Sequence, residues 1–131
     1  YYRMVFIDSG NDESDPMWRR MIDHADQIVV VTSTRDDHAE AGALLLEALQ
    51  TRDAHAAELA RNAVAIVTQA DSKASSADIR RIVEGFESLA REVVTIPFDQ
   101  AMVGGVLRYD ALAPQTQRAW LGAGAAVARG L

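Results

Sequence analysis

The sequence has no cysteine, only one lysine and no long hydrophobic run, and these absences exclude several classes of protein. Without cysteine there can be no disulfide framework, no thiol nucleophile and no cysteine zinc site. No apolar stretch approaches the length of a membrane span and no signal peptide is visible, so we expect a cytoplasmic protein. The Gly-x-x-x-x-Gly-Lys-Ser/Thr loop is missing too, so nothing in these residues would cradle a triphosphate.

Composition and charge narrow the remaining possibilities. The chain has 131 residues, of which 49% are hydrophobic, which predicts one folded domain over residues 1–131 and argues against disorder. The formal net charge of −6 disfavours a nucleic acid or an anionic membrane surface as partner, although a local basic patch is compatible with it.

The hydrophobic pattern indicates an α/β fold. Short β-branched or apolar runs at 4–7, 27–32, 63–68 and 92–96 read as strands, and stretches with helical spacing lie between them. Such alternation predicts a mostly parallel sheet covered by helices on both faces, a three-layer αβα architecture. Residues 51–62, charged and rich in alanine, suggest a continuation of the preceding helix or a solvated connector.

Helix-start signals support this order. Asp15 followed by Pro16 predicts an N-cap and a first helical residue. Asp37 with Glu40 resembles a capping box, Ser75 or Ser76 caps the next helix, and Pro114 starts the last one. The last helix, which includes Trp120, could lie on a membrane surface, but its glycines and sparse basic residues favour packing in the core.

The first apolar run organises the rest of the prediction. Met4-Val5-Phe6-Ile7 reads as a strand buried on both faces, which belongs in the middle of a sheet. The chain starts with Tyr1 rather than Met and enters this run within three residues, so we expect a piece of a longer protein.

Polar residues follow all four predicted strands. In a parallel sheet the carboxyl ends open onto one edge, where ligands bind. Acids there suit hydrated Mg²⁺, and hydroxyls and amides suit a phosphate or a base. Asp8 could equally cap its strand and bind only solvent. The predicted edge comprises Asp8, Ser9, Gly10, Thr32, Ser33, Thr34, Thr68, Gln69, Asp71, Pro97, Phe98 and Asp99.

Other chemistries have weaker support. His24, His38 and His55 are scattered without a second ligand at helical or turn spacing, so solvated helix positions are favoured over a metal site. No serine lies in a nucleophile-elbow sequence, which leaves a hydrolase triad without a starting point.

The order of these motifs resembles the C-terminal part of the ParA/MinD-type deviant-Walker P-loop ATPases, which partition chromosomes and plasmids or position cell machinery. Met4 to Gly10 looks like their apolar strand ending in Asp-Thr-x-x-Gly. The stretch from His24 to Thr32 is similar to their Ala-Asp-x-hydrophobic run, and the stretch from Ile96 to Val103 to their Ile-Pro-x-Asp-x-x-Val segment.

The resemblance implies roles for particular residues. Asp8 would be the catalytic carboxylate that holds Mg²⁺ through water and acts by charge and position, and Ser9, Gly10 and Asn11 would form the switch that senses the γ-phosphate. The remaining nucleotide-binding positions would be Thr68, Gln69, Asp71, Pro97, Phe98 and Asp99. The family has prolines after the Asp and Asn after the third strand, where this chain has Gly10 and Thr68-Gln69. Thr68 to Asp71 also resembles the Thr-Lys-x-Asp guanine motif of signal-recognition GTPases, so the base preference stays open.

By this resemblance the intact protein would bind ATP and Mg²⁺, form a homodimer across two nucleotides and hydrolyse ATP slowly. The P-loop would lie upstream of Tyr1, so this chain alone would bind no cofactor and show no turnover. The alternative is a non-enzymatic α/β scaffold that binds an unidentified protein partner. A receiver- or flavodoxin-like domain is a third reading, but no acidic pair precedes Asp8.

Overall fold

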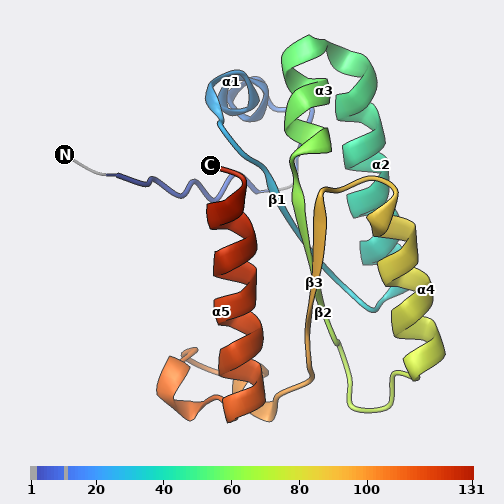
Figure 1. Ribbon diagram of the computed structural model, residues 1–131, viewed down its shortest axis with the longest axis vertical. Coiled ribbons are helices and arrows are strands. Elements are labelled where there is room, and N and C mark those ends of the chain that lie inside the picture. Colours follow the sequence, from blue (N-terminus) through green and yellow to red (C-terminus); the bar gives the residue numbers. More distant parts are fainter. Residues whose placement is uncertain (1–2, 11) are drawn as a thin grey trace.

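A computed structural model describes residues 3–10 and 12–131, and over these the chain forms an α/β fold with one parallel sheet (Figure 1). The strands are β1 (Val29–Ser33), β2 (Val64–Thr68) and β3 (Glu92–Ile96). The helices are α1 (Pro16–His24), α2 (Asp36–Arg52), α3 (Ala54–Arg61), α4 (Ser76–Glu87) and α5 (Pro114–Arg129), with short 3₁₀ turns η1 (Gln100–Met102) and η2 (Tyr109–Ala111).

The sheet has the order β1-β2-β3, with every strand parallel to its neighbour. Val64 of β2 pairs with Val29 of β1 and with Glu92 of β3. The residues of β2 from Val64 to Val67 are at most 5% exposed, as expected of a central strand that is apolar on both faces. Three of the four predicted strands are therefore confirmed within a residue or two.

Helices cover both faces of the sheet. On one face α2 packs against β1 and α4 against β3, with α3 beside α2, while α5 lies on the other face against β2 and β3 (Figure 1). Alternate residues of β2 serve the two faces: Ala65 and Val67 join the core under α2 and α4, and Val64 and Ile66 join the core under α5. The predicted three-layer layout and the core packing of the last helix are confirmed.

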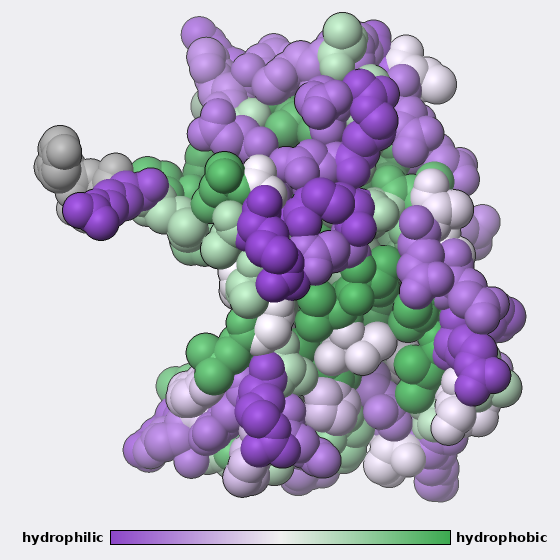
Figure 2. All heavy atoms as spheres, viewed as in Figure 1, coloured by the Kyte–Doolittle hydropathy of each residue, from purple (hydrophilic) through white to green (hydrophobic). Residues whose placement is uncertain are grey.

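The predicted first strand is not formed. Residues 4–7 make no strand pairing, and Met4, Val5, Phe6 and Ile7 are 46%, 71%, 76% and 66% exposed. Among the described residues, none hydrogen-bonds to residues 3–7. Figure 2 shows this segment, which we call the N-terminal arm (residues 3–10), projecting from the body with hydrophobic side chains uncovered. The prediction failed because an apolar run specifies burial, whereas a strand also needs a partner strand to hydrogen-bond with.

Side-chain N-caps begin α1, α3 and α4, whereas α2 and α5 begin without one. Asp15 accepts from the Met17 amide and Pro16 is the first helical residue of α1, as predicted, and Ser75 caps α4. The Asp37 capping box is wrong: α2 begins at Asp36 after Arg35, which makes no side-chain cap bond. The Asp37 carboxylate pairs with the Arg35 guanidinium instead, at 2.9 Å.

Residues 51–62 contain a helix break that the composition did not predict. Asp53 ends α2 in an extended conformation, and its side chain accepts from the Ala56 amide to cap a separate helix, α3. This helix buries its alanine-rich face and Leu59 against the body. In the part of the chain that the structure describes, no helix is both long and apolar enough to cross a membrane.

Candidate functional site at the carboxyl edge of the sheet

The carboxyl ends of the three strands open onto one end of the molecule, away from the C-terminal end of α5 (Figure 1). The register aligns Ser33 with Thr68 and Thr68 with Ile96, so the three polar loops that follow are neighbours. This is where a parallel α/β sheet usually binds ligands. We call it the carboxyl edge.

Hydrogen bonds join the first two loops of the carboxyl edge. The Thr34 amide donates to the Thr68 carbonyl at 3.0 Å, and the Ala70 amide donates to Thr34 Oγ1 at 2.9 Å. The Thr68 hydroxyl donates to the Thr32 carbonyl at 3.0 Å. The Thr34 and Thr68 hydroxyls therefore hold the loops together, and Thr68 is only partly exposed.

Gln69 and Asp71 form the next part of this edge. The Gln69 amide donates to the Ile96 carbonyl at 2.9 Å, which extends the β2–β3 pairing by one residue. Its side-chain amide donates to the Asp71 carbonyl at 3.1 Å, and the Asp71 carboxylate accepts from the Lys73 amide at 2.6 Å. The structure thus brings Thr68, Gln69 and Asp71 together, as the sequence predicted.

Pro97, Phe98 and Asp99 follow β3 and are all partly exposed. Asp99 Oδ1 accepts from the Ala101 amide and Oδ2 from the Ala113 amide, each at 2.9 Å. The Ala113 and Ala101 amides, and to a lesser extent the buried Thr116 hydroxyl, hold the pKa of Asp99 below its usual value. Because Ala113 is the residue just before α5, Asp99 clamps the start of that helix to the end of β3.

The N-terminal arm does not bring Asp8, Ser9 or Gly10 to the carboxyl edge. The arm leaves the body at the level of the amino ends of the strands (Figure 1). The Gly10 amide donates to Asp8 Oδ1 at 3.3 Å, and Gly10 adopts a φ of 65° that favours glycine. These contacts are local to the arm, and Asn11 lies outside the described residues. The predicted magnesium ligand, with Ser9 and Gly10, is therefore apart from the predicted site residues that follow the three strands.

Sequence reasoning missed one side-chain pair at this edge. Ser33 Oγ lies 2.8 Å from His38 Nδ1 and also accepts from the Arg35 amide at 3.2 Å. His38 is exposed as predicted, but its ring is held at the start of α2 rather than free. The available signal was a serine at a strand end with a histidine five residues later, on the first turn of a helix. Similarly, His55 Nε2 lies 3.1 Å from the Ile22 carbonyl and links α3 to α1.

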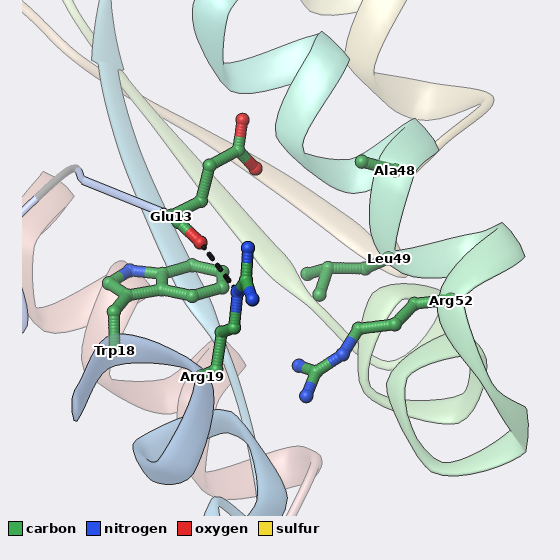
Figure 3. A pocket seen from close by; sticks show the side chains of 6 residues that line it. All are labelled: Glu13, Trp18, Arg19, Ala48, Leu49 and Arg52. Carbon is green, nitrogen blue, oxygen red and sulfur yellow. Dashed lines mark hydrogen bonds between the residues drawn. The ribbon is translucent and has the colours of Figure 1, made fainter. Parts of the chain in front are cut away.

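A small depression lies away from the carboxyl edge, between α1 and α2 (Figure 3). It has a volume of about 190 Å³, and Trp18, Leu49, Arg19 and Arg52 are among the residues that line it. Arg52 pairs with Asp23 at 3.1 Å and with Asp53 at 3.5 Å, and Arg19 Nε donates to the Glu13 carbonyl at 3.3 Å. Contacts within the protein therefore already hold both guanidinium groups.

Comparison with known proteins adds no family to this description, since the chain matches no protein-family model, no curated protein and no solved structure. Across residues 3–10 and 12–131, no three side chains of the histidine, aspartate or glutamate type gather as a metal-binding group.

Proposed function

We propose that this chain is the C-terminal part of a ParA/MinD-like ATPase, a nucleotide-dependent dimerising switch. The observation that carries the proposal is the N-terminal arm, in which four consecutive large apolar side chains lead directly to Asp8 and are largely exposed, with no pairing strand in the described part of the chain. Among the residues that the structure describes, β1 and β3 each pair only with β2, so both edges of the sheet are open, and the β1 edge can take further strands. Folded proteins avoid both exposed apolar strands and long unpaired sheet edges, and further strands of the same sheet would remove both.

The energetics support this reading of the arm. Fully burying one side chain of the Val, Ile, Phe or Met type contributes roughly 1.5–3 kcal/mol, so four of them favour a buried strand by several kcal/mol. The exposed Val31 of β1 points to a face of the sheet, so a helix packed on the added strands would cover it. We therefore propose that strands outside these residues complete the sheet and take in residues 4–7.

In that completed sheet, the end of the arm would lie at the carboxyl edge with Thr68, Gln69 and Asp71. Asp8 would then hold Mg²⁺ through water, and Ser9 to Asn11 would respond to the γ-phosphate of ATP. The lysine-bearing phosphate loop would come from the added strands. Asp8 would contribute charge and position, because phosphoryl transfer depends chiefly on positioning and on stabilising the charge of the phosphates.

ATP hydrolysis by the complete gene product tests this proposal. We expect Mg²⁺-dependent turnover and ATP-dependent dimerisation, both lost in Asp8→Asn, whereas Asp12→Asn in the same polar turn retains them. The 131-residue chain alone should show neither. Equal activity of Asp8→Asn and Asp12→Asn, or steady turnover by the isolated chain, would contradict the proposal.

The second candidate function is a non-enzymatic scaffold that binds a protein partner. It is favoured by the hydrogen bonding at the carboxyl edge. There, Asp99 and the Thr34 and Thr68 hydroxyls bond to backbone groups of the protein itself, which stabilises the loops. A complete gene product that folds, lacks ATP binding by calorimetry and still forms a stable complex in pull-down experiments would establish this candidate instead of the first.

A further inference from the structure

A groove runs between α2 and α4 on the face of the sheet opposite α5, and it begins beside the carboxyl edge, at Asp36. Its volume is about 460 Å³, more than twice that of the depression in Figure 3. Apolar side chains form its interior, and α2 lines it with a stripe of residues at helical spacing. The lining residues are Asp36, Ala39, Glu40, Ala43, Glu47, Arg81, Ile82, Gly85, Phe86, Ser88 and Leu89.

Gly85 keeps the middle of this groove open. It lies inside α4, where glycine costs about 0.5–1 kcal/mol relative to alanine. Nothing lies within 4 Å of the position a Cβ would occupy there, so neither close packing nor a positive φ requires glycine. Gly42 on α2 differs, because its Cβ would approach Val30 at 3.1 Å and Phe86 at 3.2 Å. At Gly85 a partner can reach the helix backbone.

The groove carries a net negative charge, from three carboxylates and one guanidinium group. Arg81, the groove's cation, pairs with Asp36 at 2.8 Å. Glu40 and Glu47 form no ion pair with any other residue that the structure describes. The unneutralised charge of the groove is therefore negative, and an apolar interior beside free carboxylates complements a segment that carries both apolar and cationic side chains.

We propose that the α2–α4 groove binds a basic amphipathic helix of a partner protein. Apolar side chains of that helix lie over Gly85 and the alanines of α2, and its Lys or Arg side chains face Glu40 and Glu47. This inference does not depend on the ATPase proposal, because the groove is built from α2 and α4 alone and none of its lining residues is a proposed nucleotide ligand.

The test is binding of a fluorescent helical peptide of Leu and Lys, about 15 residues long so that a helix can form, followed by anisotropy at low and high salt. Gly85→Leu fills the groove from a helix position, and we expect it to weaken binding at least tenfold. Gly85→Ala should have a smaller effect and also raise Tm, since alanine favours the helix. Gly122→Leu and Gly122→Ala, at an equally open position of α5, are the matched controls.

The charge contribution is tested by the double variant Glu40→Gln/Glu47→Gln. We expect about tenfold weaker binding and a smaller salt dependence, whereas Glu13→Gln/Asp26→Asn, which removes the same charge elsewhere, leaves both unchanged. Equal losses in the two double variants would show attraction to net charge alone, and unchanged binding by folded Gly85→Leu would place the peptide elsewhere. Either result overturns the proposal, as does failure of the unmodified chain to bind the peptide.

Discussion

The N-terminal arm and the central strand β2 both contain a short apolar run, yet the run in the arm is exposed and the run in β2 is buried. Val64 to Val67 are almost completely buried, whereas Met4 to Ile7 expose about half to three quarters of each side chain. Strand β2 hydrogen-bonds to a strand on each side, and the arm hydrogen-bonds to no strand. A hydrophobic run therefore favours burial, but it becomes a buried strand only where a neighbouring strand is available to pair with it.

The strongest way to test this comparison is a matched pair of isoleucine truncations. Ile96→Ala removes a fully buried side chain at the end of β3 and should lower the free energy of unfolding by about 2–5 kcal/mol. Ile7→Ala removes one that is mostly exposed, so the change should stay within about 0.5 kcal/mol. Urea denaturation of the two variants measures both. A large loss in Ile7→Ala would show that the arm packs against the body.

Two glycines give the next largest contrast. Gly42→Ala places a methyl group against Val30 and Phe86; overpacking costs about 1–3 kcal/mol and replacing a helical glycine gains about 0.5–1 kcal/mol, so we expect a net loss of up to about 2 kcal/mol. Gly10→Ala strains a backbone with φ of 65°, but the arm can relax because nothing lies near that Cβ position. We expect a loss below about 1 kcal/mol for Gly10→Ala, measured by thermal unfolding. If the order of the two losses were reversed, the arm would be the more constrained region.

The smallest expected difference is between Asp99 and Asp8, which were both predicted to lie at the carboxyl edge, in how each affects stability at low pH. The pKa of Asp99 is lowered by the Ala113 and Ala101 amides, so its contribution to stability is complete above its ordinary pKa near 3.8 and is lost as pH falls through the lower folded value. Asp99→Asn should therefore lower Tm at pH 7 and reduce the loss of stability between about pH 4 and pH 2. Acid titration of Tm for Asp99→Asn and Asp8→Asn measures this, and equal effects would contradict the clamp.

Much of the fold could be read from the sequence because its signals were local. Continuous β-branched and apolar runs located β1 to β3, and Asp15, Ser75 and Pro114 marked helix starts through bonds or ring geometry within a few residues. The helix break at Asp53 was not predicted, because the alanine-rich residues on both sides favour a helix. Only the hydrogen bond from the Ala56 amide to the Asp53 side chain separates α2 from α3.

The candidate site could be predicted only in part. Thr68, Gln69 and Asp99 were assigned to one edge because they follow parallel strands, and register alone brings them together. Their hydrogen bonds to backbone groups of other loops depend on tertiary structure and could not be predicted from the sequence. Asp8 was assigned to the same edge because it follows residues 4–7, which were predicted to form a strand. These residues do not pair with another strand, and this is why Asp8 lies apart from Thr68, Gln69 and Asp99.

The parallel arrangement of the sheet has a consequence for how the chain folds. Every strand pair includes β2, and each joins segments separated by at least one helix, since Val64 must meet both Val29 and Glu92. Closing such long loops costs entropy before any pairing is gained, which slows folding relative to a helical bundle of the same length. Because both strand pairs include β2, we expect high φ-values in β2 and the helices beside it, and φ-values near zero in residues 3–10.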